Sequence, residues 1–410
     1  MLNSDSLKQE LSLPCGAKVR NRFLKSAMSE ALGTTDLGPG PLLNRLYQTW
    51  SEGGTEILIT GNVMIDARYL GEPGNVVVEN EKDLEALKQW AKAGTSKGNH
   101  LWMQINHPGK QIPGFLCKEP VAPSAVPLKL PMFNKPRAMT QEEILETIQR
   151  YGRTAGIARK AGFTGVQIHG AHGYLVSQFL SPHHNQRTDE WGGSLENRMR
   201  FLREVYLAMR EQVGTDFPVS LKVNSADFQR GGFTEEESLT VIQTIADDGI
   251  DLVEISGGNY EAPAMMNGAR KTAESTRQRE AYFLVFAEEV RKRTKVPIAV
   301  TGGFRTAKGM IDAVESGATD IIGTARPLAI DPDFPNRIMM GHDFQSLVQE
   351  KISTGVKLLD TALMLNLTWY ERQLELLGKG KKPDPYMNPW MAAAQVLFSV
   401  NLKNLRRRRA

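Results

Sequence analysis

Residues 165–200 read GVQIHGAHGYLVSQFLSPHHNQRTDEWGGSLENRMR, and they contain one complete strand-to-helix unit. The short apolar run at 165–169 is typical of a buried strand, and the segment at 195–213 has the spacing of an amphipathic helix. The loop between them is dense in hydrogen-bond donors, with imidazoles, a phenol and several Arg and Asp residues. Because parallel α/β folds place their ligand-binding loops at the carboxyl ends of strands, we predict that this loop faces a ligand.

The same unit recurs along the whole chain. Short apolar or β-branched runs predict strands at 23–28, 56–60, 101–105, 165–169, 218–223, 251–255, 297–301 and 319–323. Helical periodicity predicts helices near 41–52, 81–97, 140–161, 195–213, 234–247, 277–293, 306–316 and 334–350. This repeat predicts an α/β fold, a (β/α)8 TIM barrel with extra loops. A doubly wound sheet is disfavoured because no G-x-G-x-x-G turn follows the first strand.

Two stretches fall outside this repeat. Residues 111–137 are rich in proline and predict a long excursion on the side of the barrel where active-site loops lie. Residues 351–410 have helical pattern at 351–378 and an apolar helix near the end. We therefore expect one domain, with a barrel and an N-terminal cap segment in residues 1–350 and a C-terminal helical extension in residues 351–410.

Composition excludes several classes of protein. The chain has 410 residues, 41% hydrophobic and 23% charged, which is ordinary for a globular protein. The net charge is only +4, so we expect no nucleic-acid partner. Cys15 and Cys117 lie far apart, which disfavours a disulfide scaffold, a structural zinc site or an iron-sulfur cluster and fits a reducing compartment. Because the first residues also lack a signal-peptide pattern, we expect a cytoplasmic protein.

The C-terminus carries an apolar stretch at 390–402, followed by four arginines at 406–409. The apolar stretch is shorter than the roughly 20 residues that a membrane-spanning helix needs. A subunit contact in a homo-oligomer is the favoured interpretation of this segment. Contact with a membrane surface is the less favoured alternative.

Polar residues follow the predicted strands, and in a barrel they would ring one mouth. One half of this mouth suits an anion, because Gly302 and Gly303 end the seventh strand and Arg326 follows the eighth. Barrels frequently bind a phosphate between these two loops. In the alternative interpretation, the glycines only serve tight turns.

The other half suits the reduction of a polarised double bond. His169 and His172 can direct two N–H donors at one carbonyl oxygen, where negative charge develops when hydride arrives at the conjugated carbon. Tyr174 is a candidate proton donor, since a phenol with an unperturbed pKa near 10 stays protonated at neutral pH. Lys222 lies mid-strand between apolar residues and needs a partner in a barrel interior, for which an electron-rich ring is suitable.

Less specific interpretations exist for several of these residues. His169 and His172 could form a metal pair, but no third ligand lies nearby in the sequence, and we expect no metal. His183 and His184 are expected to be solvated loop residues. An ion-paired loop that holds the shape of the site is expected from Arg187, Asp189, Glu196, Asn197 and Arg198.

Residues 169–201 closely resemble the signature of the old yellow enzyme family, the FMN-dependent NADH:flavin oxidoreductases and ene-reductases. The resemblance continues in order with NRFLKSAM (21–28), MQINHPGKQ (103–111), VTGGFRT (300–306) and DIIGTARPLAIDPDFP (320–335). It covers roughly residues 10–340.

This resemblance implies an FMN across the barrel mouth. It implies isoalloxazine contacts from Ala27, Met28, Ser29 and Gly61, a pyrimidine-edge hydrogen bond from Gln104, and a cation near N1 and O2 from Lys222. It implies phosphate contacts from Gly303, Ala325 and Arg326. His169 and His172 match the pair that binds the substrate oxygen, and Tyr174 matches the proton donor.

The chain departs from the family pattern at three positions. Ser29 stands where relatives often have threonine or cysteine, which leaves the flavin potential open. Ala31 replaces a tyrosine that contacts the substrate in one branch of the family, and this leaves that wall of the substrate pocket open. Ala325 occupies a position that is commonly glycine. The extra cluster-binding and nucleotide-binding domains of larger relatives are not expected.

The implied reaction has two steps. NADH or NADPH reduces FMN and leaves, and an electron-poor alkene such as an α,β-unsaturated carbonyl then accepts hydride, with a proton from Tyr174. One alternative is NAD(P)H oxidase activity with oxygen as acceptor. Another is a flavin reductase that acts on RNA uridine, supported only by the arginines at 406–409. A flavin-binding protein without enzymatic activity is the weakest alternative.

Overall fold

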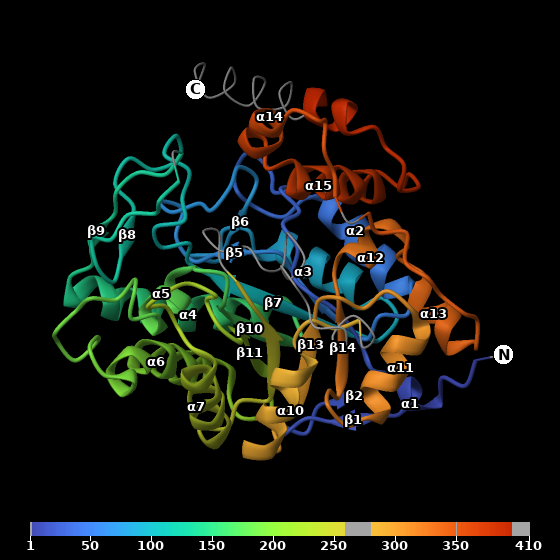
Figure 1. Ribbon diagram of the computed structural model, residues 1–410, viewed down its shortest axis with the longest axis horizontal. Coiled ribbons are helices and arrows are strands. Elements are labelled where there is room, and N and C mark those ends of the chain that lie inside the picture. Colours follow the sequence, from blue (N-terminus) through green and yellow to red (C-terminus); the bar gives the residue numbers. More distant parts are fainter. Residues whose placement is uncertain (1, 131, 259–279, 350, 396–410) are drawn as a thin grey trace.

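The computed structural model describes residues 2–130, 132–258, 280–349 and 351–395 (Figure 1). Its core strands are β3 (Phe23–Lys25), β4 (Ile57–Ile59), β7 (His100–Asn106), β10 (Gly165–Gly170), β11 (Val219–Asn224), β12 (Leu252–Ser256), β13 (Ile298–Thr301) and β14 (Ile321–Thr324). They are parallel in the order β10-β11-β12-β13-β14-β3-β4-β7, and β7 pairs back with β10. The barrel is therefore closed, and the predicted (β/α)8 fold is confirmed.

Helices surround the barrel (Figure 1). They are α2 (Pro41–Glu52), α3 (Leu84–Gly94), α4 (Gln141–Ala161), α6 (Leu195–Val213), α7 (Glu235–Asp247), α10 (Leu284–Arg293), α11 (Ala307–Glu315), α12 (Arg326–Ile330) and α13 (Phe334–Met339). Thr140 and Thr234 start α4 and α7 with capping boxes, in which a glutamate three residues later closes the reciprocal bond. Part of the helix predicted at 277–293 lies outside the described residues.

The helix predicted at 334–350 is wrong in length. It ends at Met339, because Gly341 adopts a φ of +83° and the chain turns there. The N–H of His342 bonds to the carbonyl of Arg337, which closes the helix end. Further along, Gln345 forms an antiparallel bridge with Thr306 instead of a helical turn.

Several short elements lie outside the repeat. The antiparallel pair β1 (Leu11–Ser12) and β2 (Lys18–Val19) follows the short helix α1 (Asp5–Lys8). The strands β5 (Val63–Met64) and β6 (Val76–Val77) extend the sheet beyond β7. Within the proline-rich excursion, β8 (Val121–Ala122) pairs with β9 (Arg137–Ala138).

The inside of the barrel is built in layers, because alternate residues of each strand point inward. An apolar layer contains Leu24, Ile57, Ile59, Trp102, Leu252, Ala299 and Ile321, with Leu13 and Val19 of the N-terminal segment packed against it. Two residues further along the strands lie Ser26, Gln104, Gln167, Lys222, Glu254 and Thr301, which we call the polar layer. Every side chain of the polar layer is buried, so each requires a hydrogen-bond partner.

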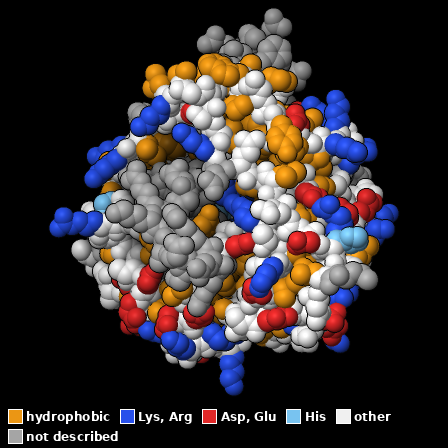
Figure 2. Space-filling view, turned by 45° about the vertical axis from the view of Figure 1, so that its right-hand side comes forward, with side chains coloured by type: hydrophobic (Ala, Val, Ile, Leu, Met, Phe, Trp, Pro, Cys, Tyr) orange, Lys and Arg blue, Asp and Glu red, His pale blue; other side chains and the backbone are white. Residues whose placement is uncertain are grey.

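The C-terminal part forms α14 (Lys357–Ala362) and α15 (Leu365–Gly378). Helix α15 packs against α2 and α12 of the barrel. Exposed large apolar side chains in this part are Leu358, Tyr386, Trp390 and Met391; Figure 2 shows hydrophobic side chains gathered at this end of the molecule. The arginines at 406–409 lie outside the described residues. Among the helices described, none has the length and apolar character to cross a bilayer.

Candidate active site

Every predicted site residue lies at the carboxyl ends of the barrel strands. Ala27, Met28 and Ser29 follow β3, Gly61 follows β4, Gln104 lies in β7, His169 in β10, and Lys222 in β11. Gly303 follows β13, while Ala325 and Arg326 follow β14. Barrel closure thus assembles these residues from distant parts of the sequence at one mouth.

Two imidazoles and a phenol meet directly after β10. The ring of His169 lies 5.2 Å from that of His172 and 4.8 Å from that of Tyr174, measured between centroids. Tyr174 is the N-cap residue of the short helix α5 (Leu175–Leu180), whose first N–H bonds to the carbonyl of His107, directly after β7. The helix therefore fixes the phenol beside the two imidazoles.

Both imidazoles are neutral at physiological pH. Burial, followed by the charges of His172 and Lys222, holds the pKa of His169 well below its ordinary value. Burial and the charge of Lys222 lower the pKa of His172 to about 3. The Nδ1 atom of His169 accepts the N–H of Ala171 at 3.3 Å, so its ring proton resides on Nε2.

Three neighbours hold His172 in an unusual conformation. Its φ is +61°, which a bulky residue adopts only when the surroundings impose it. Its N–H donates to Asn224 Oδ1 at 3.1 Å, and its carbonyl accepts from Gln111 Nε2 at 2.9 Å. Its ring Nε2 lies 2.8 Å from Ser256 Oγ. If Ser256 donates this bond, the remaining ring N–H of His172 is on Nδ1 and is available to a ligand.

A pair of amides extends from the phenol into the barrel. Asn62 Nδ2 lies 3.4 Å from the hydroxyl of Tyr174, and Asn62 Oδ1 accepts from Asn106 Nδ2 at 3.3 Å. Asn106 is fully buried in β7. These bonds help to orient the phenol.

Lys222 has a partner that the sequence analysis missed. Its Nζ lies 2.9 Å from Glu254 Oε1, and the two residues are cross-strand neighbours on β11 and β12. Burial alone would raise the pKa of Glu254, but Lys222 and the hydrogen bonds from Thr301 and Gln167 outweigh it and hold the pKa below its ordinary value. Glu254 is therefore an ionised carboxylate inside the barrel. A polar residue at an inward position of an apolar strand was the signal that could have revealed it.

The polar layer continues from Glu254 to Gln104. Gln167 Nε2 donates to Glu254 Oε2 at 2.9 Å, and Gln104 Nε2 donates to Gln167 Oε1 at 2.7 Å. Gln104 Oε1 is buried and has no hydrogen-bond partner in the described part of the chain. A buried acceptor without a partner is costly, and it suits a ligand that brings a donor.

The ends of β3 and β4 are already hydrogen-bonded to protein groups. The hydroxyl of Ser29 donates to Glu72. The N–H of Gly61 donates to Glu30 Oε1 at 2.9 Å, and a Cβ on Gly61 would lie 2.5 Å from the backbone carbonyl oxygen of Met28. Position 61 therefore requires glycine. Beside Ala31 lies a cavity of about 10 Å³, which is space for about one water molecule.

Two guanidinium groups occupy the predicted anion half. Gly303 has a φ of +103°, and a Cβ there would lie 1.9 Å from the carbonyl oxygen of Glu280. Burial, followed by the charge of Arg326, lowers the pKa of Arg305. Arg326 lies over the ring of Tyr370 on α15, 5.9 Å from its centroid. In the described ranges neither arginine forms an ion pair, and the Glu280 carboxylate, which accepts from the backbone N–H of Arg305 at 2.8 Å, offsets only part of their charge.

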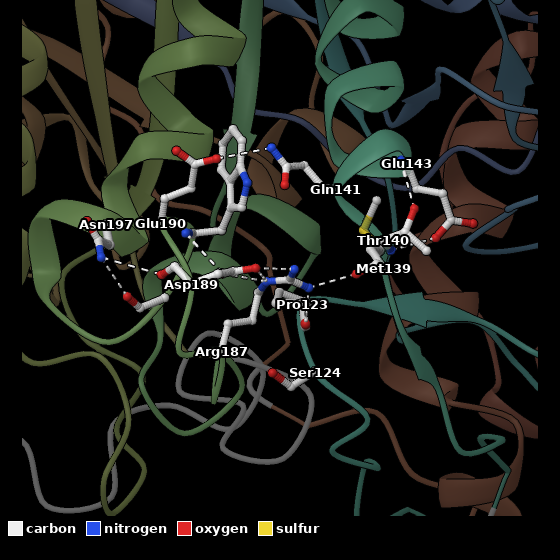
Figure 3. Close-up of polar contacts among 12 residues, drawn as sticks. Pro123, Ser124, Met139, Thr140, Gln141, Glu143, Arg187, Asp189, Glu190 and Asn197 are labelled. Carbon is white, nitrogen blue, oxygen red and sulfur yellow. Dashed lines mark hydrogen bonds and ion pairs between the residues drawn. The ribbon is translucent and has the colours of Figure 1, made fainter.

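Arg187 ties the loop after α5 to the proline-rich excursion (Figure 3). It donates to the carbonyls of Pro123 and Met139 at 3.1 and 2.7 Å and pairs with Asp189. Arg198 bonds to Glu237 on α7. The prediction that this segment is an ion-paired structural loop is confirmed for these residues.

The prediction that His184 is solvated is wrong. Its ring is buried, and Nδ1 accepts from Lys110 Nζ at 2.8 Å. Burial, then the charges of Lys110 and His183, lower its pKa to about 3. Folding brings Lys110 and His184 together from segments that are 74 residues apart. As for metals, no group of three or more His, Cys, Asp or Glu side chains within the described ranges could hold one.

We expect His184 to make the fold acid-sensitive. Its pKa is lower in the folded chain than in the unfolded chain, so its contribution is complete above about pH 6.5 and is lost as the pH falls toward 3. His184→Asn keeps an acceptor for Lys110 but removes the titration. The free energy of unfolding is measured by urea denaturation between pH 6 and 4.5. As the pH falls, it should decrease less steeply in His184→Asn than in the wild type, with slopes that differ by about 1.4 kcal/mol per pH unit. His183→Asn, at the partly buried neighbour, is the control, and an equal slope in all three proteins would contradict the prediction.

The chain is similar to known proteins over most of its length. Residues 15–345 match the model of the NADH:flavin oxidoreductase / NADH oxidase family. An NADH-dependent flavin oxidoreductase from Hypocrea jecorina is 35% identical over 359 residues, which are 81% of this chain and 88% of the relative.

Solved structures show the same architecture. The chain is similar to 2-naphthoyl-CoA reductase in its complex with 2-naphthoyl-CoA, with a TM-score of 0.77 and 28% identity over 82% of this chain and 52% of that one. It also shares the fold of an old yellow enzyme homologue from Zymomonas mobilis, with a TM-score of 0.72 and 24% identity over 84% of this chain and 95% of that one. The family model and the Hypocrea relative each cover most of the chain, and it therefore belongs to the NADH:flavin oxidoreductase / NADH oxidase family.

Proposed function

We propose that this FMN-dependent oxidoreductase uses NAD(P)H to reduce its flavin and then reduces an electron-poor alkene conjugated to a carbonyl group. The observation that carries the proposal is the contact of His169, His172 and Tyr174 at the mouth, where two neutral imidazoles and a phenol share one corner. Such a set binds an oxygen and supplies a proton without adding a charge of its own.

The described residues fit FMN at both of its ends. The unpartnered Oε1 of Gln104 suits the N–H of the pyrimidine edge, and the charges of Arg305 and Arg326 suit the phosphate. We propose that FMN is held by Ala27, Met28, Ser29, Gly61, Gln104, Lys222, Gly303, Ala325 and Arg326. Since the hydroxyl of Ser29 already donates to Glu72, a contact from Ser29 to the ring would require that bond to be shared or broken.

Each residue of the corner has its own task. The bound FMN supplies the hydride chemistry, accepting two electrons from NAD(P)H and returning them to the alkene. His169, through Nε2–H, and His172, through Nδ1–H, bind the carbonyl oxygen and stabilise the charge that develops on it. Tyr174 gives its proton to the alkene carbon that does not receive hydride. Asn62 holds the phenol in position.

A similar protein supports this substrate class. The 2-naphthoyl-CoA reductase is named for a thioester whose carbonyl is conjugated to carbon-carbon double bonds. A conjugated carbonyl compound of this kind presents one oxygen to a pair of donors. Because the chain spans 52% of that protein, the particular substrate is not transferred.

An anaerobic spectroscopic titration tests the proposal. The purified protein should be yellow, and NADH or NADPH should bleach the flavin band. Addition of 2-cyclohexenone or N-ethylmaleimide should then restore the band with stoichiometric formation of the saturated product. Bleaching without recovery would reject alkene reduction and leave the flavin assignment intact.

Oxygen is the alternative acceptor, since the family name includes NADH oxidase. We distinguish the two by admitting air to the bleached protein. Recovery of the band in air but not with the alkenes would identify an oxidase. Recovery with the alkenes at a much higher rate than with air would identify an alkene reductase.

A further inference from the structure

We propose that Glu254, which lies in the polar layer beside Lys222, determines the hydrogen-bonding polarity of Gln104 and thereby makes Gln104 an acceptor toward the pyrimidine N3–H of FMN. The inference rests on the proposed placement of Gln104 at the flavin. It assigns a positioning role to a residue that does not itself contact the cofactor or the substrate.

The ionised carboxylate of Glu254 can only accept hydrogen bonds. Glu254 Oε1 accepts from Lys222 Nζ at 2.9 Å and from Thr301 Oγ1 at 2.7 Å, while Oε2 accepts from Gln167 Nε2 at 2.9 Å. The side chain is completely buried, so water does not replace any of these donors. Its charge therefore forces Gln167 to turn its NH2 group toward it.

The orientation of Gln167 then fixes that of Gln104. With its NH2 group on Glu254, Gln167 presents Oε1 to β7 and accepts from Gln104 Nε2 at 2.7 Å. Gln104 consequently points its Oε1 away from Gln167, and this atom has no partner among the residues described. One carboxylate thus sets the direction of two amides.

Strand register makes this chain of bonds rigid. Gln104 and Gln167 are directly opposed on β7 and β10, and Lys222 and Glu254 are directly opposed on β11 and β12. The bond from Gln167 to Glu254 crosses the barrel interior over β11, between strands that are not neighbours. Neither amide can turn over without opposing two donors or two acceptors in a dry interior.

The isosteric substitution Glu254→Gln should reverse the direction of every hydrogen bond from position 254 to Gln104. Lys222 and Thr301 both donate to the Oε1 position, so the new amide oxygen stays there and its NH2 group faces Gln167. Gln167 then turns its oxygen toward position 254 and its NH2 group toward Gln104. Gln104 in turn presents NH2, a donor, where the wild type presents an acceptor.

The experiment measures binding of oxidised FMN labelled with ¹⁵N at N3, with no nicotinamide or alkene present. In the wild type, the N3–H proton should be shifted downfield and protected from exchange. In Glu254→Gln, it should move upfield or be lost to exchange, and the FMN dissociation constant should rise about tenfold, since two donors then face each other. A wild-type N3–H signal and affinity in this variant would overturn the proposal.

The double variant Glu254→Gln with Gln167→Glu provides the rescue. It moves the carboxylate from position 254 to position 167. Gln104 therefore again turns its NH2 group toward position 167 and presents its oxygen on the other side. The N3–H signal and affinity should return toward wild type, which a general packing defect would not do. Failure of this rescue in a folded double variant would contradict the proposal.

Two further variants complete the design. Thr301→Val removes a donor to Glu254 but leaves the carboxylate, so the N3–H signal should be unchanged. Should Glu254→Gln not fold, Gln167→Met serves in its place. It removes the hydrogen bonds between Glu254 and Gln104 but keeps the ion pair of Lys222 with Glu254. An unchanged N3–H signal in this variant would also overturn the proposal. Thermal unfolding is recorded for each variant. Because no turnover is involved, failure of alkene reduction would leave this test unaffected.

Discussion

Tyr174→Phe should slow reoxidation of the reduced enzyme by 2-cyclohexenone by about 10²- to 10⁴-fold, because the proton donor is lost while the ring stays in place. The phenol is 7% exposed and lies against His169, so water has little access to replace its proton. Stopped-flow absorbance of the flavin band measures the rate. Reduction of the flavin by NADH should change by no more than about twofold, since that half of the reaction requires no proton from Tyr174.

Tyr206→Phe is the matched control for this variant. Tyr206 is another buried phenol, but it lies on α6 outside the barrel, and its loss should leave both half-reactions at the wild-type rate. An unchanged rate of reoxidation in Tyr174→Phe would remove Tyr174 from the role of acid. A loss of flavin reduction in that variant would indicate a damaged fold instead.

His169→Leu or His172→Leu should lower kcat/KM for the alkene by about 10²- to 10³-fold, because each removes one donor to the carbonyl oxygen. The pH dependence provides a second readout. The pKa of His172 is lowered to about 3, and that of His169 lies well below its ordinary value, so both are neutral donors at neutral pH. The wild-type rate of alkene reduction should therefore show no inflection near pH 6.5.

His183→Ala serves as the control for the two imidazoles. His183 belongs to the same segment, and its ring lies against that of His184, 4.9 Å between centroids. We expect its alkene kcat/KM to match the wild type. The assignment fails if either site variant retains its kcat/KM, or if a titration near pH 6.5 governs the rate of the wild type.

The strands and most of the helices could be predicted because their signals are local. The run GVQIH at 165–169 and its counterparts are short and apolar, and each lies within a few residues of the strand found. Thr140 and Thr234 begin helices through bonds to residues three positions away. The helix predicted at 334–350 failed at Gly341, where a positive φ and a bridge to Thr306 replaced further turns.

The site was predicted only in part. His169, His172 and Tyr174 lie within six residues, so their proximity follows from the sequence. Lys222 could be recognised from the sequence as a buried cation that needs a partner, but Glu254 could not be identified as that partner. Glu254 has an equally apolar neighbourhood in DLVEI, yet its relation to Lys222 depends on the pairing of β11 with β12.

The sequence by itself therefore determined the barrel, the order of its units and the side of the barrel that carries the polar residues. Tertiary structure alone decided the partners: Glu254 for Lys222, Gln167 for Gln104, Lys110 for His184, and Ser256 for His172. The physical reason is that helices and buried strands are encoded by periodicity within about twenty residues. Hydrogen-bond partners and burial, by contrast, are set by strand register and barrel closure, which join segments that no local pattern relates.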